Sequence, residues 1–232
     1  MRCVNLREEK KLWKKGYQNV AGLDEVGRGP LSGPVVAAAT TLTNFRKLNF
    51  RNLAVNDSKK LTPLKRKTLY KILTNNFCIE WGIGRVSEKV IDKINILEAT
   101  KVAMKKAVKN LEKKLSSTSK RQKYHISYDR RNRSIINFLI LDGNFNINLP
   151  IPQKSIIKAD EKVFSCQVAS IVAKVHRDRI MERYHKLYPQ YGFDKHKGYP
   201  TKHHTRMLKK YGPCKIHRKT FKPVANFKNL KI

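Results

Sequence analysis

Residues 19–42 of this 232-residue chain read NVAGLDEVGRGPLSGPVVAAATTL. Two short apolar runs, NVAGLD and PVVAAATTL, flank a loop rich in glycine and proline, and the pattern predicts two strands. Asp24 and Glu25 lie where the first run ends. Because the chain has 17 acidic residues against 51 lysines and arginines, two adjacent acids before a glycine loop point to a specific use.

The composition indicates a globular protein with a nucleic-acid partner. At 232 residues and 40% hydrophobic content, the chain can bury the core of one medium-sized domain. A formal charge of +34 attracts phosphate polymers from solution. Compositional drift towards lysine, asparagine and isoleucine is the alternative explanation for part of this charge.

The cysteines and the hydropathy of the chain exclude several classes of protein. Four separated cysteines, without C-x-x-C pairs or histidines at ligand spacing, argue against a disulfide framework or a structural zinc site. No apolar run approaches the roughly 18 residues of a membrane span, and the first residues lack a signal-peptide core. We expect a cytoplasmic protein that does not enter a membrane.

The remaining pattern predicts an α/β fold. Strands are expected at CIEWGIGRV and FLILD, and a third at SIIKAD, which leads into a helix. A helix is expected at PLKRKTLYKIL, and two more are indicated by apolar residues that recur at helical spacing on one face. The first face comprises Val90, Ile94, Leu97, Met104 and Val108, and the second Phe164, Val168, Ile171 and Val175. We predict a mixed sheet domain at residues 15–186, a small helical C-terminal region at 187–232, and an exposed loop or disordered insert at 112–134.

Four acids occupy similar places in this scheme. Asp24 and Glu25, Asp142, and Asp160 each follow a predicted strand, and the ends of neighbouring strands converge. Carboxylate oxygens suit Mg²⁺ or Mn²⁺, and clustered carboxylates in a basic chain suit two-metal hydrolysis of phosphodiesters. Each acid also has a plainer interpretation. Asp142 could be a turn residue, Asp160 a helix N-cap, and Glu25 could point away from Asp24 on a regular strand.

The glycine loop excludes two nucleotide-binding motifs. Gly27, Gly29 and Gly33 do not match the dinucleotide fingerprint, and no G-K-[ST] follows for a P-loop. Three glycines beside Arg28 indicate a backbone that can approach a ligand closely, although a plain turn between strands would also use glycine.

Taken in order, the motifs resemble the type 2 ribonuclease H family, ribonuclease HII, of the bacterial type. GLDEVGRGPLSGPVVAAA resembles the first signature of the family. Later motifs follow in the family's order over roughly residues 20–224: NDSKKLTPLKR, ILDGN, VASIVAKVHRDRIM, YGFDKHKGYPTKHH and GPCKIHRKTFKPV. The chain has KAD at residues 158–160, where the family usually has KGD.

The resemblance implies a ribonuclease H-like fold and the residues of its site. It implies hydrolysis of the RNA strand in RNA/DNA hybrids and incision 5′ to a single ribonucleotide in duplex DNA. The implied metal-binding and catalytic acids are Asp24, Glu25, Asp142 and Asp160, with two Mg²⁺ or Mn²⁺ ions. The implied contacts to the sugars are Gly27, Arg28 and Gly29 at the ribose 2′-hydroxyl and Tyr199 at the following deoxyribose.

Basic and small residues near the motifs are candidates for phosphate contacts. Ser170 could reach a phosphate or simply allow close helix packing. The lysines could equally be solvated; the candidates are Lys59, Lys60, Lys174, Lys195 and Lys197. The histidines show no metal-ligand spacing, and we interpret them as surface or phosphate-side groups; they include His196, His203, His204 and His217.

Three other kinds of protein fit parts of the pattern. A non-catalytic nucleic-acid-binding protein, or a ribosome-associated basic protein, would explain the charge but not four acids. The sister family, ribonuclease HIII, is expected to have an additional N-terminal domain, and about 20 residues before the first predicted strand are too few for one. We therefore predict a ribonuclease HII-like enzyme that acts as a monomer on nucleic acid.

Overall fold

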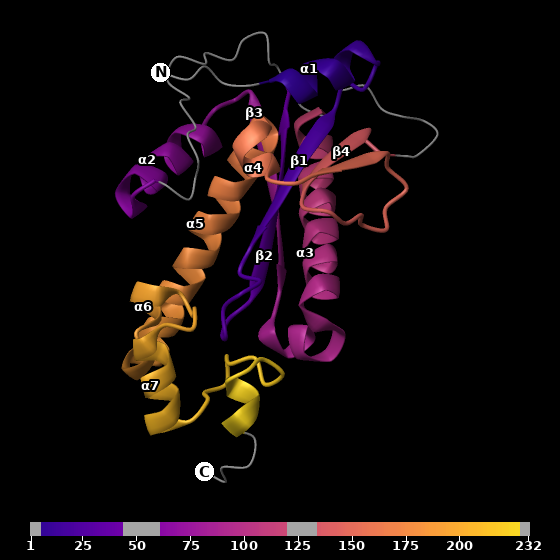
Figure 1. The fold of residues 1–232 in the computed structure, drawn as a ribbon. Coiled ribbons are helices and arrows are strands. Elements are labelled where there is room, and N and C mark those ends of the chain that lie inside the picture. The colour runs from indigo at the N-terminus through magenta and orange to yellow at the C-terminus, as the bar shows by residue number, and fades with distance from the viewer. Residues whose placement is uncertain (1–5, 44–60, 120–133, 228–232) are drawn as a thin grey trace.

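The computed structural model describes residues 6–43, 61–119 and 134–227. Five strands form one mixed sheet in the order β3-β2-β1-β4-β5, with helices packed against it (Figure 1). The strands are β1 (Val20–Val26), β2 (Val35–Leu42), β3 (Ile79–Val86), β4 (Phe138–Asp142) and β5 (Gln153–Ile156). The α/β fold with a mixed sheet that the sequence predicts is confirmed.

Helices connect the strands and continue the chain beyond the sheet. The α-helices are α1 (Arg7–Lys14), α2 (Pro63–Thr74), α3 (Glu88–Ser119), α4 (Ala159–Lys162), α5 (Phe164–Leu187), α6 (Phe193–His196) and α7 (Lys202–Tyr211). Two 3₁₀ segments, η3 (Pro189–Tyr191) and η4 (Val224–Phe227), complete the C-terminal region. None of the described helices combines the length and the apolar content needed to cross a bilayer.

The middle strand, β1, joins two kinds of pairing. It is antiparallel to β2, to which the glycine loop connects it, and parallel to β4, which the chain reaches only after β3 and α3. Parallel neighbours require such a crossover, whereas antiparallel neighbours need only a short turn. In the β1–β4 register Leu23 is opposite Leu141, so Asp24 and Asp142 both lie one residue further on, at the same end of the sheet.

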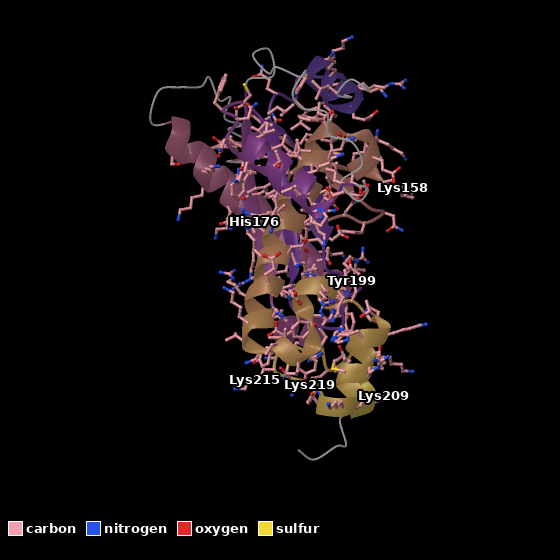
Figure 2. The ribbon with its side chains drawn as sticks, turned by 90° about the vertical axis from the view of Figure 1, so that its left-hand side faces the viewer. Lys158, His176, Tyr199, Lys209, Lys215 and Lys219 are labelled. Atoms are coloured by element: carbon pink, nitrogen blue, oxygen red, sulfur yellow. The ribbon has the colours of Figure 1, made fainter. Side chains whose placement is uncertain are left out.

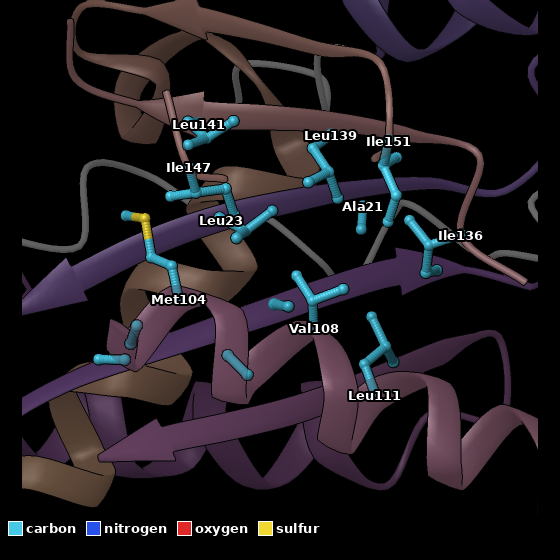
Figure 3. Packing of buried hydrophobic residues seen from close by; sticks show 14 of the residues in the cluster. Ala21, Leu23, Met104, Val108, Leu111, Ile136, Leu139, Leu141, Ile147 and Ile151 are labelled. Carbon is cyan, nitrogen blue, oxygen red and sulfur yellow. The ribbon is translucent and has the colours of Figure 1, made fainter. Parts of the chain in front are cut away.

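Helix α3 covers one face of the sheet. Met104, Val108 and Leu111 on this helix pack in one buried cluster with Ala21 and Leu23 of β1 (Figure 3). The predicted apolar face is correct for Met104 and Val108.

The start of α3 differs from the prediction. Val90 is exposed, and its neighbour Ile91 is buried instead. The backbone of Asn95 is non-helical, with φ 64°, and interrupts α3. Because this break changes the phase of the helix, one 3.6-residue pattern cannot describe both sides of Asn95.

Glycines in β3 allow α3 to lie close to the sheet. A Cβ atom at Gly84 would lie 1.8 Å from the carbonyl oxygen of Ala103, and one at Gly82 would lie 2.3 Å from that of Ala107. The backbone of α3 therefore occupies the space that side chains would need. These two positions of β3 must be glycine for the helix to pack as it does.

Helix α5 covers the opposite face of the sheet. The strand β2 is buried along its whole length, so its alternate residues serve both faces: Ala37 and Ala39 face α3, whereas Val36 and Ala38 face α5. The predicted buried face of α5 is confirmed, since its four residues Phe164, Val168, Ile171 and Val175 are all buried.

Two further expectations about local structure are wrong. Residues 112–119, expected to be loop, continue α3, and Leu115 on this segment is buried in the core; residues 120–133 of the expected insert lie outside the described residues. The strand expected to end at Asp160 ends at Ile156, and Asp160 lies in α4. The polar composition of residues 112–119 does not indicate a helix, because the C-terminal end of α3 buries only a narrow stripe of residues.

The C-terminal helices lie next to the end of α5 (Figure 1) and form an apolar cluster of their own. Phe193, Leu208 and Ile216 pack there with Met181 of α5 and Leu31 of the glycine loop. The cluster therefore joins the C-terminal region to the loop that follows Asp24 and Glu25. The division of the chain at residue 186 stays a prediction.

Candidate active site

Three carboxylates from different elements meet at the ends of β1 and β4. Asp24 lies on β1, Asp142 is the last residue of β4, and Asp160 lies in α4. Each offers a carboxylate oxygen, and these three oxygens all lie within 4.8 Å of one another. The backbone N–H of Ala159 donates to Asp142 Oδ1 over 2.8 Å, which fixes the start of α4 beside β4 and so places Asp160.

Burial dominates the electrostatics of this triad. Asp24 is 5% exposed and Asp160 is 1% exposed. Burial raises the pKa of Asp24 well above its usual range, and the nearby charges of Glu25, Asp142 and Asp160 raise it further; a hydrogen bond from Ser170 lowers it. Three carboxylates at this separation, two of them buried and Asp142 partly buried, repel one another, so the group needs added protons or a cation.

Glu25 lies beside the triad but is not part of it. Its Oε1 forms an ion pair of 3.2 Å with Arg28 Nη1, while its buried Oε2 accepts no hydrogen bond within the described structure. Burial raises the pKa of Glu25, whereas the charge of Arg28 lowers it. A fourth carboxylate oxygen is thus available next to the three that already lie together.

This donor set fits divalent cations. Mg²⁺ and Mn²⁺ are hard cations that prefer carboxylate oxygens, and the triad with Glu25 supplies such oxygens from a mutually repelling group that is only partly exposed. A bound cation would remove the repulsion that raises the pKa of Asp24. The residues that could hold it are Asp24, Asp142 and Asp160, with Glu25 beside them.

A cleft of about 270 Å³ opens over the carboxylates and collects most of the predicted substrate-binding residues. Tyr199, labelled in Figure 2, is 41% exposed and lines this cleft. Its Cε1 atom would lie 3.5 Å from a Cβ atom placed on Gly29. Predicted residues that line the cleft are Asp24, Glu25, Gly27, Arg28, Gly29, Asp142, Ser170, Lys174 and Tyr199. Lys59 and Lys60 lie outside the described residues.

Two cations at the cleft come from helices on the same side of the sheet. Lys174 of α5 forms an ion pair of 2.8 Å with Asp178, and burial lowers the pKa of Lys174. Arg66 of α2, which the sequence did not single out, also lines the cleft, and it donates to the Leu61 carbonyl over 2.8 Å. Residue type alone could not distinguish Arg66 from the other basic residues of its motif.

Two fully buried arginines hold the glycine loop through hydrogen bonds to its backbone. Arg177 of α5 donates to the carbonyl oxygens of Ser32, Pro34 and Lys197, over 2.9 to 3.1 Å. Arg218 donates to those of Gly27, Arg28 and Gly33, over 2.6 to 3.0 Å. No local pattern in the sequence indicates this role, because the partners of both arginines are backbone atoms from distant segments.

The prediction that the histidines are surface groups is wrong for two of the four. His204 and His217 are 0% and 2% exposed, and their Nε2 atoms lie 3.0 Å apart. His196 is half-buried and stacks on His204, while His203 is exposed. The absence of metal-ligand spacing does not make a histidine a surface residue, because these rings are buried through hydrogen bonds to one another and to the backbone.

A mixed sheet with buried carboxylates at its strand ends, in a strongly basic chain, is typical of phosphodiester hydrolases that use divalent cations. The family model for Ribonuclease HII matches residues 21–224. A Ribonuclease HII from Lactobacillus helveticus is 49% identical over 94% of this chain and 76% of its own length; one from Chlamydia trachomatis is 45% identical over 94% and 91%. The chain therefore belongs to the ribonuclease HII family.

The structural comparison agrees with this assignment. The crystal structure of ribonuclease H2 from Pyrococcus horikoshii OT3 superimposes with a TM-score of 0.65 at 27% identity, over 90% of this chain and 96% of the other. The ribonuclease H-like fold expected from the motifs is confirmed. The chain is a ribonuclease H, a hydrolase that acts on nucleic acid, and its relatives support endonuclease activity on RNA/DNA hybrids.

Proposed function

We propose that this protein hydrolyses the RNA strand of RNA/DNA hybrids and also incises 5′ to single ribonucleotides embedded in duplex DNA, acting as a monomer. The observation that carries the proposal is one cleft lined by the carboxylates of Asp24, Glu25 and Asp142, by the Gly27–Gly29 loop and by Tyr199. Hydrolysis needs the first feature, and recognition of one ribose needs the other two. A net charge of +34 supports binding to a nucleic-acid backbone.

Asp24, Asp142, Asp160 and Glu25 would hold two divalent cations, Mg²⁺ or Mn²⁺. When bound, such a pair supplies an activated water and neutralises charge on the phosphate and on the departing 3′ oxygen. Asp24 would be the central holder of these cations, because it lies on the middle strand and the charges of Glu25 and Asp142 both act on it. The products would be a 3′-hydroxyl and a 5′-phosphate.

The glycine loop would recognise the ribose. The 2′-hydroxyl distinguishes ribose from deoxyribose, and backbone atoms of Gly27, Arg28 and Gly29 can approach it closely because two of these residues lack side chains. The ring of Tyr199, which lies next to Gly29 in the same cleft, would pack on the deoxyribose that follows. Ser170, Lys174 and Arg66 line the cleft where phosphates would pass.

The direct test uses a labelled DNA duplex with one ribonucleotide, incubated with the protein in Mg²⁺, in Mn²⁺ and in EDTA, beside an all-DNA duplex. The proposal expects metal-dependent incision 5′ to the ribonucleotide and no cut in the control. Binding without incision in either metal would favour a non-catalytic nucleic-acid-binding protein. A protein that cleaves a long RNA/DNA hybrid assayed in parallel, but leaves the single-ribonucleotide duplex intact, would refute the assigned role of Tyr199 at the deoxyribose.

The variant Asp142→Asn tests the carboxylates. Asparagine keeps an oxygen that can accept from the Ala159 N–H, so the fold should persist, while one negative charge is removed. A loss of several kcal/mol of transition-state stabilisation predicts turnover reduced by on the order of 10³-fold or more. Hybrid binding should stay equal or become tighter, since repulsion of the phosphates decreases.

Glu98→Gln is the matched control, because Glu98 is an exposed acid on α3 whose ion pair in the described part of the chain is with Lys101 at the surface. It should keep wild-type turnover. Asp142→Asn cleaving at the wild-type rate in ordinary Mg²⁺ would refute the metal assignment.

A further inference from the structure

A chain of hydrogen bonds runs from the C-terminal region to the backbone of Tyr199. The Cys214 N–H donates to His217 Nδ1 over 2.9 Å, and His217 Nε2 lies 3.0 Å from His204 Nε2. His204 Nδ1 then lies 2.9 Å from the carbonyl oxygen of Tyr199. Both rings are buried, and neither belongs to the group of carboxylates that lie together among the described residues.

The groups at the two ends of this series of hydrogen bonds determine which ring nitrogens carry the protons. His217 Nδ1 accepts from a backbone N–H, so the proton of the neutral ring is on Nε2. The Tyr199 oxygen can only accept, so His204 carries its proton on Nδ1 and offers the lone pair of Nε2. The Nε2–H of His217 therefore donates to His204 Nε2, and each ring nitrogen of this neutral pair has a partner. His217 Nδ1 also lies 3.2 Å from Cys214 Sγ and 3.3 Å from the Cys214 carbonyl oxygen.

The segment that carries Tyr199 is held at other points as well. His196 Nε2 lies 2.6 Å from the Tyr191 carbonyl, and the Gly198 N–H donates to His196 Nδ1 over 3.2 Å. The Leu31 N–H donates to the Gly198 carbonyl over 2.8 Å, which joins this segment to the glycine loop. The Tyr199 carbonyl itself also accepts from the Thr201 N–H.

We infer that His204 and His217 are positioning residues for Tyr199: the neutral pair fixes the Tyr199 carbonyl and thereby aims its ring at the sugar beside the ribonucleotide. The inference rests on the proposed function, which places Tyr199 against substrate. His204 supplies the bond to Tyr199, and His217 fixes the His204 tautomer that makes this bond possible. Because Tyr199 is half-exposed and its ring has no hydrogen-bonded anchor in the described structure, backbone contacts set its direction.

Two substitutions of His204 separate positioning from stability. In His204→Asn the amide nitrogen takes the place of Nδ1 and keeps a donor for Tyr199, but the link to His217 is lost. In His204→Gln the amide group takes the place of Nε2 and keeps the link to His217, but the bond to Tyr199 is lost. Each variant loses one buried hydrogen bond, so both should lower the melting temperature by a similar amount.

Only His204→Gln should impair recognition. We expect kcat/KM on the duplex with one ribonucleotide to fall roughly tenfold, mainly through KM, because the ring of Tyr199 is misplaced. His204→Asn should recover most of that loss. Equal kcat/KM for the two His204 variants would overturn the inference, because the effect would then follow stability alone.

A double-mutant cycle with Tyr199→Ala provides the second criterion. In the Tyr199→Ala background, His204→Gln should cause no further loss of kcat/KM, since no ring remains to be positioned. An additive loss would overturn the inference and leave the role of Tyr199 intact. If Tyr199→Ala alone leaves kcat/KM unchanged, the proposed role of Tyr199 fails, and the inference fails with it; metal-dependent cleavage by the wild type would still stand.

Discussion

The buried histidine pair should make the protein sensitive to acid well above the range in which carboxylates are normally protonated. Burial lowers the pKa of His204 to about 4, and burial together with the charge of His204 lowers that of His217 to about 3. In the unfolded chain both rings return to about 6.5. As pH falls below 6.5, the two rings therefore become protonated in the unfolded state but stay neutral in the native state, and the free energy of unfolding decreases.

The size of the effect follows from linkage. Between pH 7 and pH 5, each ring changes the free energy of unfolding by roughly 2 kcal/mol, so the pair contributes about 4 kcal/mol of destabilisation. His196, which stacks on His204, also has a pKa lowered by burial and acts in the same direction. Cys214 and Tyr191 face the pair but remain neutral in this range, because burial raises the pKa of each.

Buried carboxyl groups act in the opposite direction. Burial raises the pKa of Glu9, Asp24 and Glu25, so the native state takes up their protons first and gains stability as pH falls. A pH profile of the wild type alone therefore mixes the two effects. The comparison must use a variant that removes one ring and leaves the carboxyl groups in place.

His217→Gln is suited to this comparison, since the glutamine amide can still donate to His204 Nε2. Urea unfolding followed by tryptophan fluorescence, at constant ionic strength in EDTA, should give about 2 kcal/mol less destabilisation between pH 7 and pH 5 than in the wild type. His203→Asn, which removes an exposed ring of α7, should keep the wild-type profile. Parallel pH profiles for the wild type and His217→Gln would refute the assignment of neutral rings.

Two further predictions concern packing and substrate binding. Gly84→Ala should lower the free energy of unfolding by about 3 kcal/mol, because its Cβ would lie 1.8 Å from the Ala103 carbonyl; a loss below about 1 kcal/mol in urea unfolding would contradict the close packing of α3. Lys174→Gln should reduce the slope of log K against log salt for hybrid binding by about 1 if Lys174 contacts a phosphate. Lys109→Gln, an exposed substitution on α3 across the sheet, should leave the slope unchanged.

The elements that the sequence predicted are those with a local signal. Alternating and continuous apolar runs located β1, β2 and β4, and the strand ends located Asp24 and Asp142, because a parallel register brings such ends together. Asp160 was associated with the same site although its element was wrong: a four-residue helix, tied to Asp142 through Ala159, brings it there.

Sequence reasoning failed where the partner of a residue is distant in the chain and is a backbone atom or another ring. The register of α3 changes at Asn95, whose positive φ no periodicity reveals. His204 and His217 are 13 residues apart and become one unit only when the C-terminal region folds back on itself. Arg66 needs α2 to pack beside α5 before it reaches the cleft.

The two buried arginines show why the loop beside the acids can keep its shape. Burial lowers the pKa of Arg177 to about 10 and that of Arg218 to about 9, so both remain charged at neutral pH. Within the described residues neither forms an ion pair; their partners are backbone carbonyl oxygens, which accept hydrogen bonds but carry no net charge.

Two positive charges therefore lie against the backbone of the glycine loop that joins β1 to β2. The charge of Asp178 acts on Arg177, and those of Asp92 and Glu88 act on Arg218, without an ion pair in the described residues. A carboxylate partner would satisfy either guanidinium equally well, but it would add negative charge beside Asp24 and repel the phosphate. Carbonyl partners fix the loop without adding negative charge near the phosphate. Each guanidinium offers several N–H donors in one plane, an arrangement that lysine cannot reproduce, and the carbonyl oxygens accept from these donors. The same bonds attach Lys197, next to the Tyr199 turn, to the loop at Ser32 and Pro34, so the two recognition elements keep their spacing.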